Sequence, residues 1–202
     1  MLIIGTGGMG KEVLGTLITY EKCDEICFFD EDQNAAGLLY DKFKVLVSLE
    51  EAEKYLRNTD NKFITAIGHP RLREKLTKKI EKLGGKLTSL ICSNVFIFPF
   101  NDTYEGIFVH PGVGISHGVQ IGRSCVLHIN SSIGHDTTIG NYVTIGPGAS
   151  IVGPTIIGDY SYIGANATVL PDIKIGKNVI VAAGAVVNRD LCDYETFIGV
   201  RT

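Results

Sequence analysis

The part of the chain that follows residue 106 repeats every six positions, and this period limits the possible folds more than any other feature. An aliphatic residue stands at every sixth position from Val109 to Val187, fourteen times in succession without an insertion or a deletion. The fourth residue after each one is mostly small or β-branched. A period of six matches neither the 3.6 residues of a helix nor the two residues of an ordinary strand. It is typical of a β-solenoid, in which three short strands and three turns form one coil of eighteen residues.

Glycine is abundant, with 24 of 202 residues, whereas ordinary proteins contain about 7%. Disordered, collagenous and linker sequences are also rich in glycine, but they are poor in Ile and Val, which this chain has in number. Within the repeat, a glycine directly follows the aliphatic residue at Gly122, Gly134, Gly140, Gly146, Gly158, Gly164 and Gly176. We expect these glycines to occupy turn positions with positive φ.

Residues 1–92 instead alternate apolar strand-like runs with helical patterns. The expected strands cover residues 2–4, 26–29, 63–67 and 88–91, and the expected helices cover residues 11–20, 49–56 and 71–83. Ser48 is a suitable N-cap, and Glu51 three residues later completes a capping box. The alternation predicts a small parallel sheet with right-handed crossovers over residues 1–92, then a linker over residues 93–106 and the solenoid over residues 107–202.

A glycine-rich turn follows the first expected strand. Gly5, Gly7 and Gly10 have the spacing of a dinucleotide-binding turn, in which backbone N–H groups approach a phosphate at a helix N-terminus. Asp30 follows about twenty residues later, where a carboxylate can bind a ribose or sugar hydroxyl. The residues before the repeat are too few for a complete six-stranded dinucleotide domain. A nucleotide-sugar pocket, a purely structural turn and an NAD site therefore remain as alternatives.

Four of the five histidines are spaced by one coil, His110 with His128 and His117 with His135. Positions eighteen residues apart stack at about 4.8 Å, so we expect two neighbouring histidine columns along one edge of the solenoid. Outward turn positions tolerate polar residues, so this coincidence alone carries little weight. A metal site is not predicted, because no carboxylate or cysteine accompanies the histidines at a fixed spacing.

His135 is followed by Asp136, and this pair suits acid–base chemistry. Transfer of an acyl group to an amine or hydroxyl needs a base, and imidazole titrates near neutral pH. A neighbouring carboxylate can fix the tautomer of the imidazole and stabilise its protonated form. The hydrophobic repeat does not require a histidine at this outward position.

The hexapeptide repeat, together with the segment GTGGMGKE at residues 5–12, resembles the sialic acid and bacillosamine-type sugar O/N-acetyltransferases. These are hexapeptide-repeat acyltransferases with a left-handed parallel β-helix, and the resemblance covers essentially the whole chain. It implies a small Rossmann-like βαβ domain that binds a nucleotide sugar, followed by the β-helix. It also implies a homotrimer that transfers acetyl from acetyl-CoA to a nucleotide-linked amino sugar or to sialic acid, for surface glycan biosynthesis.

The resemblance also assigns roles to individual residues. It implies that His135 is the general base and that Asp136 is its accompanying acid. The implied sugar-nucleotide site comprises Thr6, Gly7, Gly8, Asp30, Gly68 and His69. The candidate coenzyme A contacts are Thr144, as a hydrogen-bond donor, and Gly146, Gly153 and Ala183, as backbone contacts to the pantetheine arm. Gly153 lies one coil above His135, where a side chain would block this arm, and for the three small residues an ordinary turn position remains the alternative. The chain departs from the family pattern at His69 and His128, where Asn is usual, at Thr144, where some members have a second histidine, and at Arg201, where Pro is usual.

Charge and composition exclude some other classes of protein. Nineteen basic and twenty-two acidic residues give a net charge of -3, which argues against nucleic-acid binding. No apolar run approaches the ~20 residues of a membrane span. The five cysteines, Cys23 among them, are scattered without a CxxC motif, which favours a reducing cytoplasm. A non-catalytic trimeric nucleotide-sugar-binding module and a γ-carbonic-anhydrase-like metalloenzyme remain as alternatives, and the sugar, the nucleotide, the acceptor atom and the acyl length stay open.

Overall fold

The computed structural model describes residues 1–20, 25–102 and 105–199. Cys23 and Arg201, which the sequence analysis singled out, lie outside these ranges. The chain forms two compact units, Met1–Leu90 and Ile91–Thr202, and each unit is described by itself.

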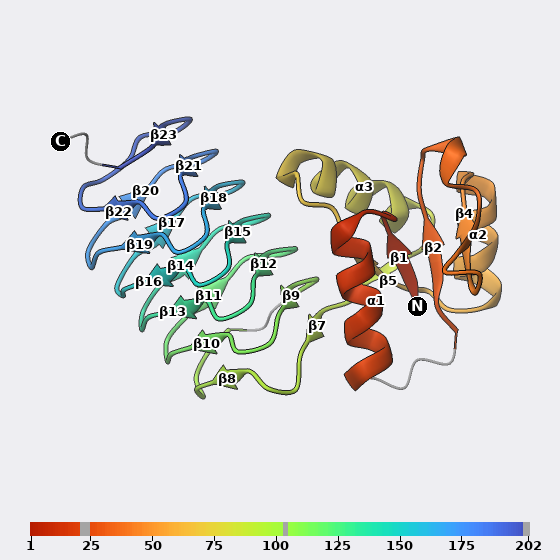
Figure 1. The fold of residues 1–202 in the computed structure, drawn as a ribbon, viewed down its shortest axis with the longest axis horizontal. Helices are drawn as coiled ribbons and strands as arrows, with labels where there is room; N and C mark the ends of the chain where they lie inside the picture. The colour runs from red at the N-terminus through yellow and green to blue at the C-terminus, as the bar shows by residue number, and fades with distance from the viewer. Residues whose placement is uncertain (21–24, 103–104, 200–202) are drawn as a thin grey trace. The chain divides into compact units, whose positions relative to one another are not determined.

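The N-terminal unit contains a six-stranded sheet with the strand order β3-β4-β2-β1-β5-β6. Its strands are β1 Leu2–Ile4, β2 Cys27–Phe29, β3 Gly37–Leu39, β4 Phe43–Leu46, β5 Lys62–Thr65 and β6 Lys86–Leu87. Figure 1 labels strands β1, β2, β4 and β5 of this sheet. Neighbouring strands are parallel except β3 and β4, which pair antiparallel. The expected βαβ domain is therefore confirmed, but its sheet is mixed rather than wholly parallel.

Three α-helices cover this sheet, together with a short 3-10 helix, η1 Gln33–Ala35. They are α1 Gly8–Tyr20, α2 Leu49–Asn58 and α3 Pro70–Lys82. Side chains of α2 and α3 pack in one cluster with Leu2 and Ile4 of β1, so both helices cover the same face of the sheet. Ser48 is the N-cap of α2 as predicted, because Glu51 N–H donates to Ser48 Oγ at 3.2 Å. The Glu51 carboxylate accepts from Ser48 Oγ at 3.2 Å and from Val47 N–H, one residue before the N-cap, at 3.3 Å.

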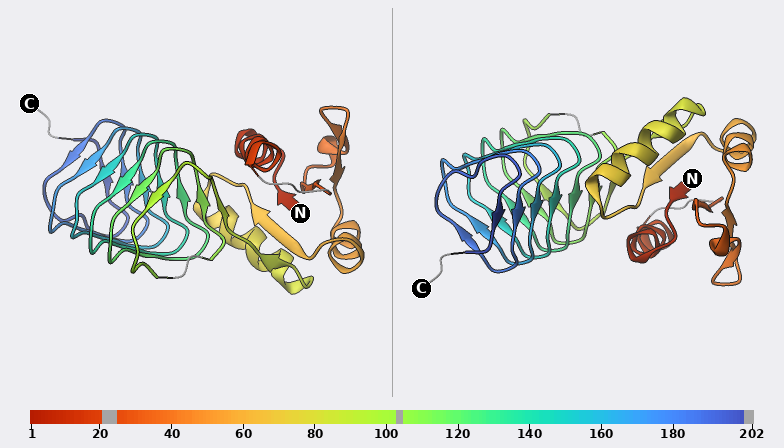
Figure 2. Two further views of the ribbon diagram at one scale, coloured as in Figure 1. Left: turned by 90° about the horizontal axis from the view of Figure 1, so that it is seen from below. Right: turned by 90° about the horizontal axis from the view of Figure 1, so that it is seen from above.

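The second unit is a solenoid whose strands are two residues long and pair in parallel, one coil apart. Gly114, for example, pairs with Ser132. We number the three sides in chain order. Side 1 contains β7 Leu90–Ile91, β9 Phe108–Val109, β12 Val126–Leu127, β15 Thr144–Ile145, β18 Tyr162–Ile163, β21 Ile180–Val181 and β23 Thr196–Phe197. Side 2 contains β8 Phe96–Ile97, β10 Gly114–Ile115, β13 Ser132–Ile133, β16 Ser150–Ile151, β19 Thr168–Val169 and β22 Val186–Val187. Side 3 contains β11 Gln120–Ile121, β14 Thr138–Ile139, β17 Ile156–Ile157 and β20 Lys174–Ile175. Figure 2 shows these coils as a stack of three-sided loops.

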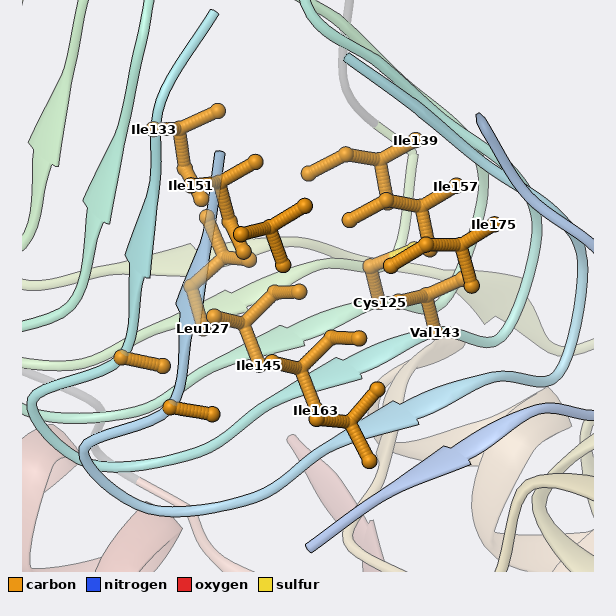
Figure 3. Packing of buried hydrophobic residues seen from close by; sticks show 14 of the residues in the cluster. Cys125, Leu127, Ile133, Ile139, Val143, Ile145, Ile151, Ile157, Ile163 and Ile175 are labelled. Atoms are coloured by element: carbon orange, nitrogen blue, oxygen red, sulfur yellow. The ribbon is translucent and has the colours of Figure 1, made fainter. Parts of the chain in front are cut away.

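The fourteen repeated aliphatic residues form the core of the solenoid, as the period predicts. Each of them is at most 6% exposed. Figure 3 shows several of them in columns, for example Ile139, Ile157 and Ile175. The fourth residue after each aliphatic one also points inward, and even Thr137 and Ser161 at this position are buried. The repeat therefore supplies two inward positions in every six.

The solenoid begins earlier in the chain than expected. The expected strand at residues 88–91 is not part of the N-terminal sheet, whose last strand ends at Leu87. Strand β7 belongs to side 1, and β8, within the expected linker, pairs with β10. The reason is that Ile91 and Ile97 lie one coil before Val109 and Ile115 and pack partly buried against the same core.

The glycines of the repeat have a different role from the predicted one. Positive φ occurs three residues after the aliphatic position, at Gly112 and Gly118 but also at non-glycine residues such as Asn130 and Asp136. A Cβ at Gly122, which directly follows an aliphatic residue, would lie 2.6 Å from the backbone carbon of Gly140 in the next coil. These glycines are needed because the coils stack closely, and not because of their own φ.

The last coil is shorter than the others. Ile180 pairs with Thr196 and Val181 with Phe197, a separation of sixteen residues instead of eighteen. The six-residue register therefore ends at Val187, which is the last residue that the repeat predicts.

Candidate active site

The two histidine columns occupy two different corners of the solenoid. His110 and His128 follow strands of side 1, whereas His117 and His135 follow strands of side 2. The expectation that both columns lie along a single edge is wrong. Each side of the solenoid takes six residues, and His110 is seven residues before His117, so the two histidines lie at successive corners. The stacking itself is confirmed, with ring centroids 4.7 Å apart in the first column and 5.6 Å apart in the second.

His135 lies on the corner between sides 2 and 3, two residues after β13. Half of its side chain is exposed, and its Nδ1 is 2.9 Å from Oδ2 of Asp136. In a neutral imidazole, a proton on Nδ1 would be donated to this carboxylate, which leaves the lone pair of Nε2 to accept a proton from another molecule. The pair thus combines an exposed imidazole with a carboxylate at hydrogen-bonding distance.

Asp136 is held in place by the coil below it. Its φ is +54°, its N–H donates to the carbonyl oxygen of His117 at 3.1 Å, and its Oδ1 occupies space that a side chain at Gly118 would need. A Cβ at Gly118 would lie 2.5 Å from that oxygen. The position of the carboxylate therefore depends on His117 and Gly118.

Gly153 stacks directly above His135. A Cβ at Gly153 would lie 1.9 Å from the carbonyl oxygen of His135, so contact between the coils requires a glycine here. As a consequence, no side chain at this position stands next to the imidazole in the coil above.

Two hollows flank the corner that carries His135. On side 2, a hollow of 330 Å³ is lined by residues that include Phe96, Phe98 and Ser150. On side 3, a hollow of 240 Å³ is lined by Asp136, Asp172 and Lys174 among others. Space for ligands is therefore available on both sides of the candidate base.

The other candidate coenzyme contacts lie elsewhere on the solenoid. Thr144 is a buried residue of β15 on side 1, and Gly146 and Ala183 lie on the corner between sides 1 and 2. Ala183 borders a separate hollow of 370 Å³. Within one chain, Gly153 is next to His135, but Thr144, Gly146 and Ala183 are not brought together with it.

The candidate residues of the N-terminal unit lie at one edge of the sheet. Strands β2, β1 and β5 are adjacent and parallel, so the turns that follow them lie side by side. Thr6 N–H and Thr6 Oγ1 donate to Asp30 Oδ2 at 3.0 and 2.7 Å. Burial alone would raise the pKa of Asp30, but the Thr6 hydroxyl and neighbouring backbone N–H groups lower it below its ordinary value. Asp30 is therefore a stable anion at neutral pH.

Each glycine of the turn has a distinct environment. Gly5 has φ +103°, and a Cβ at Gly10 would lie 2.1 Å from the carbonyl oxygen of Gly5. Positions 7 and 8 are open, with no atom within 4 Å of a Cβ placed at Gly7 or Gly8. This division matches the roles of the glycines in dinucleotide-binding turns, where one allows the turn, one allows a ligand to approach and one allows the helix to pack.

Gly68 and His69 follow β5 at the same edge. His69 is the N-cap of α3, and its Nδ1 accepts from Leu72 N–H at 3.4 Å, so this residue also has a structural role. The fully buried Arg73 donates to the carbonyl oxygens of Ile67 and Gly68 at 2.8 and 3.1 Å.

Sequence reasoning missed Arg73, although it lies on the buried stripe of α3 with Leu76 and Ile80. A charged residue on such a stripe signals a buried contact, which here fixes the loop after β5. A hollow of 610 Å³ in the N-terminal unit lies between the start of β2, β4 and α2, and none of the candidate residues lines it.

Comparison with known proteins agrees with both units. Residues 1–80 match the PglD N-terminal domain, and residues 118–153 and 154–189 match the bacterial transferase hexapeptide model of six repeats. None of the curated proteins matches the chain significantly. No helix in the described ranges is both long and apolar enough to cross a membrane.

Several solved structures resemble the whole chain. WeeI from Acinetobacter baumannii is 30% identical, with a TM-score of 0.86 and coverage of 96% of this chain and 94% of that one. A histidine-to-asparagine variant of perosamine N-acetyltransferase from Caulobacter crescentus, in complex with CoA and GDP-perosamine, is 27% identical, with a TM-score of 0.90 and coverage of 96% and 91%. The acetyltransferase domain of PglB from Neisseria gonorrhoeae, in complex with acetyl coenzyme A, is 28% identical, with a TM-score of 0.82 and coverage of 96% and 93%.

A βαβ unit with a glycine-rich turn, joined to a hexapeptide-repeat β-helix with an exposed histidine–aspartate pair, defines a two-part hexapeptide acyltransferase. The match over both units makes the assignment more specific. The chain belongs to the sialic acid and bacillosamine-type sugar O/N-acetyltransferase family.

Proposed function

We propose that this protein is an acetyl-CoA-dependent acetyltransferase that modifies the amino or hydroxyl group of a nucleotide-linked sugar for surface glycan biosynthesis. The observation that carries the proposal is the His135–Asp136 pair, exposed between two hollows. The similar enzymes solved with CoA and GDP-perosamine act as N-acetyltransferases, which favours an amine as acceptor.

In the proposed mechanism, both substrates bind before any bond changes. Nε2 of His135 accepts a proton as the sugar nitrogen or oxygen attacks the thioester carbonyl carbon, and the new bond to carbon forms. The tetrahedral intermediate then collapses, the carbon–sulfur bond breaks, and the imidazolium returns its proton to the coenzyme A thiolate. Asp136 stabilises the imidazolium and holds the tautomer.

The N-terminal unit is proposed to bind the nucleotide-linked end of the acceptor. The open positions at Gly7 and Gly8 let backbone N–H groups approach a diphosphate at the start of α1. Asp30, with Thr6 bound to its Oδ2, offers a carboxylate to a ribose or sugar hydroxyl. Gly68 and His69 complete this edge.

A homotrimer is part of the proposal. The candidate coenzyme contacts Gly146 and Ala183 lie on a different corner from His135, so a site that uses all of them needs corners from two subunits. Outward apolar residues such as Ile156, Ile180 and Val186 are each about half exposed in the single chain, and a subunit interface would cover them. Acetyl-CoA and sugar nucleotides are supplied in the cytoplasm, which is the proposed location.

The test is a thiol-release assay with acetyl-CoA against UDP-, GDP- and CMP-linked amino sugars and free sialic acid, with mass spectrometry of the products. We expect one acceptor to release thiol and gain one acetyl group, and His135→Asn to slow this release about 10³-fold. Sugar-nucleotide binding without thiol release from any acceptor would overturn the proposal in favour of a non-catalytic binding module. Tightly bound zinc at one per subunit with CO₂ hydration would overturn it in favour of a metalloenzyme.

A further inference from the structure

The ring of His117 lies against the ring of His135, one coil below it. The two ring centroids are 5.6 Å apart and the planes differ by 17°, which is within the usual range for offset stacked rings. No function has been assigned to His117 so far, and the hydrophobic repeat does not need a histidine at this outward position.

The same coil makes two further contacts with the candidate base pair. The carbonyl oxygen of His117 accepts the N–H of Asp136 at 3.1 Å, and Gly118 leaves room for Oδ1 of Asp136. The stretch His117–Gly118 therefore contacts the imidazole, the backbone and the carboxylate of the His135–Asp136 pair.

We propose that His117 is a positioning residue for acyl transfer, which holds the imidazole of His135 in the orientation that keeps Nδ1 on Asp136 and Nε2 toward the substrates. This inference rests on the proposed function of His135. A half-exposed side chain can otherwise occupy several rotamers, and the one in the structure makes the hydrogen bond to Asp136. The coil above supplies no such support, because Gly153 has no side chain.

The action of His117 is through its flat ring and not through a proton. This distinguishes it from a second base, because a ring without titratable atoms can replace it. His117→Phe keeps the stack and the backbone hydrogen bond to Asp136, whereas His117→Ala keeps only the backbone hydrogen bond. The two variants therefore separate stacking from acid–base chemistry.

The kinetic experiment uses the full-length enzyme with both substrates. We expect His117→Ala to lower kcat about tenfold with both KM values nearly unchanged, and His117→Phe to restore most of the loss. A matched control is Tyr160→Ala, because Tyr160 stacks on Tyr142 with centroids 5.7 Å apart and planes 2° apart on another corner. This control should keep the wild-type kcat. A wild-type kcat in His117→Ala, or an equal loss in His117→Phe, would overturn the proposal.

A spectroscopic experiment separates this inference from the assignment of His135 as base. Long-range ¹H–¹⁵N spectra of the histidine rings report which nitrogen carries the proton. We expect the wild type and His117→Phe to show His135 with its proton mainly on Nδ1, and His117→Ala to show a mixture of tautomers. Identical His135 signals in all three proteins would overturn the positioning role, even if His135→Asn proves inactive. If His135→Asn is fully active, the proposed base fails, and the spectra still decide whether His117 orients the ring.

Discussion

The two histidine columns of the solenoid share one sequence spacing and have different surroundings. His110 is 7% exposed and its ring lies 4.0 Å from that of Phe108, centroid to centroid. Burial, with a smaller contribution from His128, lowers the pKa of His110 to about 4. His135 instead has a half-exposed side chain and a carboxylate 2.9 Å away. The comparison shows that the repeat determines which residues stack, while the neighbouring residues determine what each imidazole can do.

The difference begins with position in the turn. His110 and His128 directly follow the inward aliphatic residue, whereas His117 and His135 stand one residue later. The later position precedes the residue with positive φ, and at Asp136 that residue turns its carboxylate onto the imidazole. A base next to an anion and open to solvent can accept a proton from a substrate, whereas burial disfavours the charged form of His110.

The strongest test of the comparison is the removal of the exposed imidazole. His135→Asn keeps a polar side chain on the corner but has no group that titrates near neutral pH. We expect kcat to fall by about 10³-fold, within the range for loss of a general base, without a change in thermal stability, because the side chain is half exposed. Steady-state kinetics and thermal unfolding measure the two effects, and a variant that keeps its rate would contradict the assignment.

The buried imidazole of His110 should make the free energy of unfolding depend on pH. The folded protein holds His110 neutral down to about pH 4, whereas the unfolded chain binds a proton near pH 6.5. The unfolded state therefore gains protons first, and stability should fall by about 3 kcal/mol as the pH drops from 6.5 to 4. Urea unfolding at several pH values measures this loss. His110→Phe, which still packs on Phe108, should reduce it, and an unchanged pH dependence would show that His110 is not its source.

The repeat allowed much of the solenoid to be predicted, because a period without interruption fixes both the register and the core. Elements that do not follow a period were missed or misplaced. The β3–β4 pair was missed because Leu38 is an exposed apolar residue and the short strands have no clear alternation. The strand at residues 88–91 was placed in the wrong sheet, because an apolar pair such as Leu90–Ile91 does not indicate which strand will be its partner.

The sequence proposes candidate site residues one by one but does not give their arrangement. The N-cap at Ser48 and the hydrogen bond between His135 and Asp136 are local features, because each joins residues that are near one another in the sequence. His110 and His135 lie on two different corners. The eighteen-residue spacing predicts which histidines stack, but the corner of each column follows only from the number of six-residue sides between them. The position of Arg73 on the apolar stripe of α3 signals a buried contact, but its partners, the carbonyl oxygens of Ile67 and Gly68, are known only from the fold. The roles of Gly118 and Gly153 depend on what lies in the neighbouring coil.

Removing the charge of the carboxylate beside the exposed imidazole should lower kcat less than removing the imidazole itself. Asp136→Asn keeps the size of the side chain but removes the charge that stabilises a protonated His135. We expect kcat to fall about 30-fold, less than for His135→Asn, because the imidazole can still accept a proton. Kinetics of both single variants and the double variant check this, and a double variant no worse than His135→Asn alone would show that Asp136 acts through His135. Independent, multiplicative losses would contradict that reading.

The smallest expected effect comes from adding one methyl group, as a Gly→Ala substitution, at equivalent turn positions of two corners. Gly118 and Gly112 have φ +68° and +74°, and a Cβ would meet Asp136 Oδ1 at 2.5 Å in the first case and Asn130 Oδ1 in the second. Alanine at either position should cost about 1 kcal/mol of stability, because a side chain is strained at positive φ. Only Gly118→Ala displaces the carboxylate that faces His135, so only this variant should also lower kcat, by about fivefold. Thermal unfolding and kinetics of the two variants make the comparison. Equal rates in both variants would mean that the position of the Asp136 carboxylate against Gly118 has no role in catalysis.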